Sequence, residues 1–283
     1  RAKTKEALVG VCYTVDPKPR TPEELAENLL DPEAARERRR QEGKTDDRPK
    51  AKNIRRFASL TRSKEEVIDV IKTDAERRDP QHRKRLAVLL DGALCLWKLT
   101  AKKFSAWANV TFILDIIHVV GYLWLAAGAL FEDTDSNEAK KWVREKLTEI
   151  LRGRVGYVIG ALRQMHRKTK LTEAKRAALQ QVVTYFVNHK QWMQYDKYLA
   201  LGLPVATSLA ESTCGFLIKR RMAGDGKHWG LSGGEAILVL RSLKTSNDND
   251  LRKYWSHRAR FEKVRRYGTG QNYTPHADLR LVA

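Results

Sequence analysis

Three apolar segments in the first 115 residues follow patterns typical of β-strands. Residues 6–15 end in Val-Gly-Val-Cys-Tyr-Thr-Val and stop at Asp16-Pro17, which predicts a strand that meets a turn. Residues 86–90 and 110–114 are continuous apolar runs, which predict strands covered on both faces. A helix over about 94–106 is predicted between these two strands. Strand, helix and strand with short connections form a parallel βαβ unit, so we predict an α/β sheet at the centre of the chain.

Helical periodicity dominates the rest of the chain. A capping box of Ser63 and Glu66 predicts the start of an amphipathic helix, which should end before Asp79-Pro80. Residues 118–202 show helical spacing of apolar side chains without a strand signal, which predicts an all-helical block. Further helices are predicted over about 207–221, 232–243 and 251–266.

Charge and composition narrow the class of protein. The 283 residues carry 54 Lys+Arg and 34 Asp+Glu, so the formal net charge is 54 − 34 = +20. Because 42% of the residues are hydrophobic, the chain can bury a core and is not a disordered basic tail. A positive charge of this size favours a polyanionic partner, nucleic acid first and an anionic membrane surface second.

Two segments concentrate the positive charge. Residues 36–56 hold ten Lys/Arg and four Asp/Glu, and this segment is interpreted either as a solvated loop or as a contact to phosphates. Residues 251–266 hold seven Lys/Arg and one acidic residue, interleaved with aromatic side chains. That helix is either a nucleic-acid surface or an exposed terminal helix with its aromatic side chains on the core.

Cysteines and long apolar stretches exclude other classes. Cys12, Cys95 and Cys214 lie far apart, so neither a disulfide framework nor a thiolate zinc site is indicated, and a reducing, intracellular setting is expected. The longest apolar stretch, residues 108–131, holds Asp115 and His118 near its middle. We therefore interpret it as a strand that enters a buried helix, not as a membrane span.

Two aspartates are candidates for chemistry because each follows a predicted strand. Asp91 precedes Gly92 at the strand end where α/β sheets bind ligands, although Asp-Gly also makes ordinary turns and caps. Asp115 is flanked by large apolar residues, so it should be buried and must be hydrogen-bonded or paired. His118 is close enough in sequence for a local contact with it. Two carboxylates at adjacent strand ends can also assemble a site for divalent metal ions.

Glu211 is the third acidic candidate. Ser208 and Glu211 match a capping box after Pro204, which would make Glu211 only a cap. The basic cluster Lys219 to Arg221 lies two to three turns further along the same predicted helix. Such a helix could contact both metal and phosphate, or its charges could simply complement the helix dipole. Phosphate-binding loops, serine nucleophile elbows and His-Glu-x-x-His motifs are absent from the sequence.

Taken together, a series of short motifs in this order resembles the transposases of the ISKra-type insertion sequences of bacteria. The motifs are Arg20-Thr21-Pro22-Glu23-Glu24, Glu76-Arg77-Arg78-Asp79-Pro80, Val88-Leu89-Leu90-Asp91-Gly92, Ile113-Leu114-Asp115-Ile116-Ile117-His118, Tyr195-Asp196-Lys197-Tyr198-Leu199, Gly202-Leu203-Pro204-Val205-Ala206-Thr207 and Leu240-Arg241-Ser242-Leu243.

The resemblance implies a DDE transposase, whose ribonuclease-H-like core uses two aspartates and a glutamate. By position, Asp91 matches the second aspartate and Glu211 the glutamate, and both would hold Mg²⁺ or Mn²⁺ as catalytic residues. Asp115 and His118 match an Asp-x-x-His element that supports the site. The family more often has a glycine where Ser212 follows Glu211.

The resemblance also implies partners and a location. DNA, both element ends and target, is the expected partner, together with further copies of the chain, in the bacterial cytoplasm at the nucleoid and without a membrane. The candidate DNA-binding residues are Arg38, Arg39, Arg40, Lys219, Arg220, Arg221, Arg258, Arg260, Arg265 and Arg266.

We therefore expect an α/β fold with a partial ribonuclease-H-like core, a large all-helical insertion and a helical C-terminal region. The expected divisions are 1–118 for the core with its basic loop 36–56, 119–203 for the insertion, 204–246 for the return to the core, and 247–283 for a basic helix and tail.

The first aspartate of the family should lie before Arg1, and so should its N-terminal DNA-binding part. We therefore expect a fragment that binds DNA in a salt-sensitive manner and carries out no strand transfer alone. The alternative is a non-catalytic DNA-binding remnant of a transposase, and a basic protein of the membrane surface is a more distant one.

Overall fold

The computed structural model describes residues 6–43, 50–168, 170–223, 227–247 and 249–267. The opening residues 1–5, the middle of the basic segment (44–49) and the tail expected over 268–283 lie outside the described residues. The chain divides into two compact units. Unit 1 contains the described residues through Val15, Ala51–Arg78 and the residues from Leu209 onward, and unit 2 contains Asp16–Lys50 and Asp79–Ser208.

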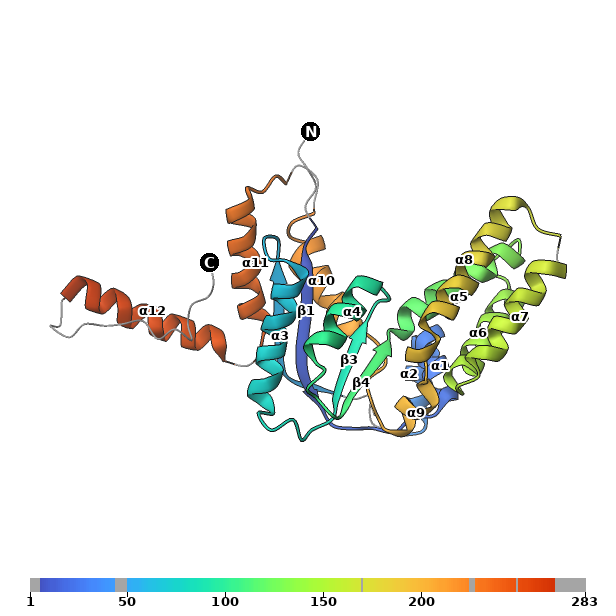
Figure 1. Cartoon of the computed structure of the whole chain (residues 1–283), viewed down its shortest axis with the longest axis horizontal. Coiled ribbons are helices and arrows are strands. Elements are labelled where there is room, and N and C mark those ends of the chain that lie inside the picture. Colours follow the sequence, from blue (N-terminus) through green and yellow to red (C-terminus); the bar gives the residue numbers. More distant parts are fainter. Residues whose placement is uncertain (1–5, 44–49, 169, 224–226, 248, 268–283) are drawn as a thin grey trace. The chain divides into compact units, whose positions relative to one another are not determined.

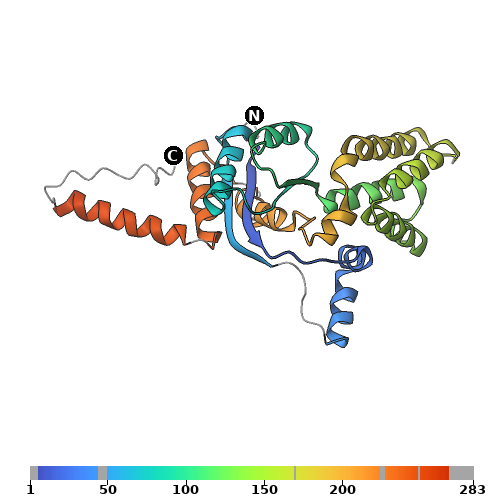
Figure 2. The same cartoon turned by 60° about the horizontal axis from the view of Figure 1, so that its bottom comes forward.

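Unit 1 is built on an antiparallel pair of strands, β1 (Leu8–Val15) and β2 (Ala51–Ser59), which lie side by side in Figures 1 and 2. The register runs from Leu8 opposite Ser59 to Val15 opposite Ala51. Helix α3 (Lys64–Arg78) packs against β1. Its start confirms the predicted capping box, because the Glu66 amide donates to Ser63 Oγ (3.2 Å) and the Ser63 amide to Glu66 Oε2 (2.6 Å).

The C-terminal helices complete unit 1. They are α10 (Ser208–Cys214), a π-helical turn η2 (Gly215–Lys219), α11 (Leu231–Thr245) and α12 (Asp250–Tyr267). Helix α11 packs on β2, and Ala58, Leu217 and Leu238 form a small buried core there. The predicted helices over 207–221, 232–243 and 251–266 are thus confirmed to within a few residues at each end.

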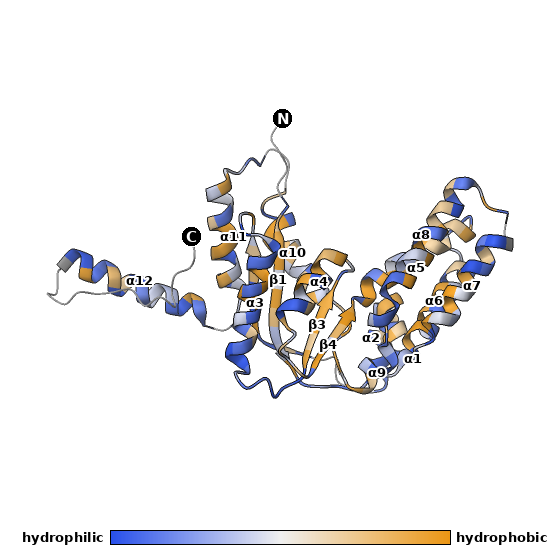
Figure 3. Cartoon of the chain, viewed as in Figure 1, coloured by the Kyte–Doolittle hydropathy of each residue, from blue (hydrophilic) through white to orange (hydrophobic). Residues whose placement is uncertain are grey.

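Unit 2 contains the predicted βαβ unit. Strand β3 (Leu86–Leu90), helix α4 (Leu94–Lys103) and strand β4 (Val110–Leu114) follow one another, and β3 pairs with β4 in parallel, with Leu90 opposite Leu114. Both strands are hydrophobic along their length (Figure 3). Ile113 and Leu114 at the end of β4 are completely buried, whereas the residues of β3 and the first three of β4 are partly buried, so the expected cover on both faces holds only for the end of β4.

Helices form the rest of unit 2. Helices α1 (Pro22–Leu30) and α2 (Pro32–Gln41) precede the βαβ unit, and six further helical elements follow it. The six are α5 (Ile116–Leu130), α6 (Asn137–Leu151), α7 (Val155–Lys168), α8 (Glu173–His189), the 3₁₀ turn η1 (Lys190–Trp192) and α9 (Tyr195–Ala200). Helix α5 packs against α6 and α8, and the apolar faces of these helices share one buried core with β4. The prediction of an all-helical block is confirmed.

The described residues therefore form a mixed α/β structure with most residues in helices and two sheets of two strands each. No described helix combines the length and the apolar composition needed to cross a membrane. The interpretation of residues 108–131 as a strand entering a buried helix agrees with β4 and α5.

The interpretation of residues 36–56 as a basic loop was wrong at both ends. Its first residues complete α2, and its last residues belong to β2. In β2 the Arg56 side chain donates to Thr213 Oγ1 (3.1 Å) and to the Thr245 carbonyl, while Arg55 pairs with Asp74 and Asp250. These charges hold unit 1 together because each arginine has acceptors within reach, which a count of charges along the sequence does not reveal.

Candidate functional site

Asp91 and Asp115 follow directly on the paired strands β3 and β4. Leu90 lies opposite Leu114 in the parallel register, and the Asp115 amide extends the pairing by donating to the Leu90 carbonyl (3.0 Å). The two aspartates therefore lie at the same edge of the sheet, as the sequence predicted. Their surroundings differ, since Asp91 is exposed and Asp115 is completely buried.

The buried Asp115 carboxylate accepts hydrogen bonds at both of its oxygens. Its Oδ1 accepts from the amides of Ile117 (3.1 Å) and Thr207 (3.0 Å), and its Oδ2 accepts from the Thr207 hydroxyl. His118 Nε2 lies 3.9 Å from Oδ2, in the local contact expected from the sequence. Burial of a carboxylate is costly unless such partners are present, so these contacts explain how the charge is tolerated. Asp115 joins the end of β4, the start of α5 and the segment before α10.

Asp91 has a looser environment. Its Oδ1 accepts a hydrogen bond from the Ala93 amide (3.2 Å). This geometry agrees with the ordinary turn that an Asp-Gly sequence predicts. Gly92 has a positive φ of 101°, and a Cβ at this position would lie 2.5 Å from the Tyr185 hydroxyl. Two side chains of α8 contact this turn. Tyr185 donates a hydrogen bond to the Asp91 carbonyl (3.2 Å), and His189 Nε2 lies 2.9 Å from the Gly92 carbonyl. The Asp91 carboxylate is thus exposed on a well-anchored turn.

Tyrosine side chains near the strand ends are hydrogen-bond donors. Tyr195 is completely buried and donates to the Leu114 carbonyl (2.7 Å). Burial, and next the charge of Asp115, raise the pKa of Tyr195 well above its ordinary value. The pKa of Tyr185 is also raised, first by burial and then by neighbours that include Tyr122, Asp91 and Asp115. Both phenols therefore stay protonated at neutral pH and serve as fixed donors.

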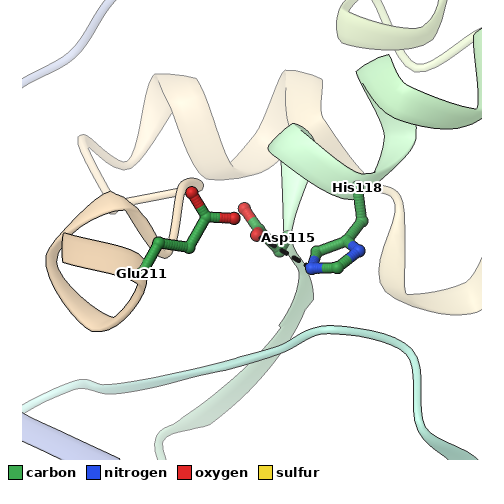
Figure 4. Close-up of side chains that lie close together, drawn as sticks. All are labelled: Asp115, His118 and Glu211. Atoms are coloured by element: carbon green, nitrogen blue, oxygen red, sulfur yellow. Dashed lines mark ion pairs between the residues drawn. The ribbon is translucent and has the colours of Figure 1, made fainter. Parts of the chain in front are cut away.

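Glu211 lies in the first turn of α10 and is exposed. The boundary between the units falls inside this helix, after Ser208. Thr207, whose amide donates to Asp115, directly precedes the helix, and Glu211 lies one turn further along it. Among the described residues, Asp115, His118 and Glu211 form a group whose ligand atoms lie within 4.8 Å of one another. Figure 4 shows the Asp115 carboxylate between the side chains of Glu211 and His118.

The capping box proposed for Ser208 and Glu211 is not present. Helix α10 begins at Ser208, so the residue before the helix is Thr207. No hydrogen bond joins Ser208 to Glu211 in the described part of the chain, and the Glu211 carboxylate is left available for another ligand.

The donors of this site differ in what they can bind. Mg²⁺ and Mn²⁺ prefer carboxylate and water oxygens, and the exposed carboxylates of Asp91 and Glu211 offer them. Both Asp115 oxygens already accept hydrogen bonds, so a metal ion there would compete with the amides of Ile117 and Thr207 and with the Thr207 hydroxyl. Asp91 is not a member of the three-residue group described above.

Of the three predicted DNA contacts on α2, two have partners within the unit. Arg38 pairs with Glu27 on α1 (2.5 Å), and Arg39 donates to Asn28 Oδ1. These two arginines hold α2 against α1, and Arg40 remains exposed.

The remaining predicted contacts are on the C-terminal helices of unit 1. Lys219, Arg220 and Arg221 are exposed at the end of the π-helical turn. Arg258 donates to Tyr254 Oη (3.3 Å), Arg265 and Arg266 pair with Glu262, and Arg260 is exposed. Trp255 is 54% exposed and Phe261 44%, so the interpretation that the aromatic side chains of α12 lie on the core is wrong for these two.

Three residues of the site, Thr207, Tyr185 and His189, are not identified by sequence patterns. Thr207 belongs to one of the motifs of the resemblance, but no pattern marks it as a partner of Asp115. Their partners Asp115, Asp91 and Gly92 lie 92, 94 and 97 residues away, so no local pattern signals them. Comparison of the chain with protein-family models, with curated proteins and with solved structures gave no match.

Proposed function

We propose that the chain is the catalytic part of a DDE-type DNA transposase of a bacterial insertion sequence, with a ribonuclease-H-like core. The observation that carries the proposal is the pair of aspartates at adjacent parallel strand ends, one exposed and one clamped to the residue before the Glu211 helix. The ordered motifs of the resemblance and the net charge of +20 support it.

The proposed division of labour follows from burial and hydrogen bonding. Asp91 and Glu211 would hold Mg²⁺ or Mn²⁺, which in such sites activates the attacking oxygen and stabilises the leaving oxygen of a phosphodiester. Asp115 is a positioning residue, because its bonds to Thr207 fix the start of the helix that carries Glu211. Exposed arginines and lysines would neutralise the phosphates of bound DNA.

Divalent-ion binding tests the assignment of Asp91 and Glu211. Calorimetric titration with Mn²⁺ is expected to show a binding event that weakens at least tenfold in Asp91→Asn and in Glu211→Gln. Glu145→Gln is a matched control, since Glu145 is an exposed carboxylate on α6. Unchanged Mn²⁺ binding in both site variants would exclude the assigned ligands.

The second candidate function is a non-catalytic DNA-binding remnant of a transposase. It is favoured by the aromatic and basic side chains exposed on α12. DNA binding that falls steeply with salt, together with no Mn²⁺ binding that depends on Asp91 or Glu211, would support this alternative.

A further inference from the structure

A groove runs between helices α7 and α8 in unit 2. It has a volume of about 450 Å³. Helix α7 contributes Arg163, His166 and Arg167, and α8 contributes Gln180, Thr184 and Asn188. Spacings of three or four residues place each set on one face of its helix, so the two faces oppose each other across the groove.

The chemistry of the two walls is complementary to an anion. Arg163 and Arg167 are exposed, and neither has an ion-pair partner among the described residues. The opposite wall carries two amides and a hydroxyl, and Gln180 and Thr184 are joined to each other by a hydrogen bond (3.2 Å). No acidic side chain lines this groove within the described part of the chain. A solvated helix face would ordinarily intersperse acidic residues with the arginines.

The groove continues along α8 into a second hollow of about 570 Å³, with which it shares Val187 and Asn188. Lys190, Gln191 and Lys197 line that hollow, with Asp196 as its one acidic residue among those described. The polar positions from Gln180 to Gln191 span eleven residues, which is roughly 17 Å at 1.5 Å per helical residue. At ~3.4 Å per nucleotide along one strand, this length matches about five nucleotides.

We propose that the α7–α8 groove binds the sugar–phosphate backbone of DNA. Arg163 and Arg167 pair with phosphates, and the amides of Gln180 and Asn188 donate to phosphate or sugar oxygens. Among the described residues, no Phe, Tyr or Trp lines the first hollow, and His166 is its one ring, so we propose a contact with little dependence on DNA sequence. The identity of the polyanion rests on the proposed function, whereas the groove and its charge do not.

The test compares two double variants that remove the same charge. Arg163→Gln/Arg167→Gln changes the groove, and Lys141→Gln/Arg144→Gln changes two exposed basic residues on α6 of the same unit. Fluorescence anisotropy with duplex DNA of two unrelated sequences is measured between 50 and 200 mM salt. Loss of two phosphate contacts is expected to reduce the slope of log K against log salt by about 1.8 and to weaken binding about tenfold or more. The control variant should keep the wild-type slope.

A second variant keeps the test informative if the double arginine variant misfolds. Thr184→Glu keeps both arginines and places a negative charge on the opposite wall, and it should weaken DNA binding as well. Unchanged circular dichroism and thermal midpoints establish that the variants are folded.

Three results would overturn the proposal. If the groove variant binds like the α6 control while the wild-type chain binds DNA, the groove is not the contact and the proposed function is unaffected. If the wild-type chain does not bind DNA, both proposals fail, and groove-dependent binding of an acidic peptide such as polyglutamate would then identify a protein partner instead. A loss of affinity confined to one of the two DNA sequences would contradict backbone recognition.

Discussion

Removal of the Asp115 carboxylate is expected to be the most damaging single change in unit 2. The substitution Asp115→Ala leaves the amides of Ile117 and Thr207, both partly buried residues, and the Thr207 hydroxyl without their acceptor. A hydrogen bond to a charged group contributes roughly 1.5–3 kcal/mol. The hydroxyl can rotate to another acceptor and the two amides cannot, so we expect a loss of about 3–5 kcal/mol, a large part of a domain's stability of roughly 5–15 kcal/mol.

Tryptophan fluorescence during urea unfolding provides the assay. Five of the seven tryptophans, residues 97, 107, 124, 142 and 192, belong to unit 2, so the signal reports mainly on this unit. With an m-value of about 1–3 kcal/mol per molar urea, the expected loss moves the midpoint down by at least ~1 M.

Asp91→Ala is the matched control, because this exposed side chain accepts one hydrogen bond, from Ala93. Its loss should lower the unfolding free energy by less than ~1 kcal/mol. The loss of unfolding free energy in Thr207→Val should lie between those of Asp91→Ala and Asp115→Ala. In the double variant Thr207→Val/Asp115→Ala the losses should be less than additive, because both changes break the same contact between the Thr207 hydroxyl and Asp115. If Asp115→Ala costs no more than Asp91→Ala, the carboxylate does not hold the segment before α10 and the reasoning is refuted.

Two further predictions concern the backbone and the thiols. Gly202→Ala should destabilise unit 2 by at least ~2 kcal/mol, because φ is +67° and the added Cβ would meet the backbone of Pro17 and Lys18. Gly128→Ala in α5 is the control and should be neutral or stabilising. Equal urea midpoints for the two variants would contradict this prediction. Burial raises the pKa of Cys12 to about 12, so little of its thiol is ionised at pH 8. A disulfide reagent should therefore modify the exposed Cys95 much faster than Cys12. Rapid labelling of Cys12, identified by peptide mass spectrometry, would contradict this prediction.

Local patterns in the sequence were sufficient to predict the elements that surround the site. The apolar runs at β3 and β4 are short, and the residues between them have helical spacing, so only a parallel βαβ unit fits. The position of Asp91 and Asp115 at one edge of the sheet follows from that topology. The capping box at Ser63 was equally local, because both of its hydrogen bonds join residues three positions apart.

Contacts between distant segments could not be predicted in this way. The burial of Asp115 required partners, but its main partner, Thr207, comes from beyond the entire helical block. The prediction that residues 36–56 form a basic loop was wrong for the same reason. Whether an arginine contacts solvent, DNA or protein depends on acids such as Glu27 and Asp250, which approach only in the folded unit.

The central proposal is that Asp91 and Glu211 are ligands of divalent ions, and iron-directed cleavage of the polypeptide tests it most directly. The chain is loaded with Fe²⁺ in place of Mg²⁺ and treated with ascorbate and peroxide, and the fragments are mapped by mass spectrometry. The account predicts backbone cuts close to Asp91 and close to Glu211, both suppressed by excess Mg²⁺, with the first set lost in Asp91→Asn and the second in Glu211→Gln. Cuts only elsewhere, or cuts near Asp91 and Glu211 that persist in the corresponding variants, would contradict it.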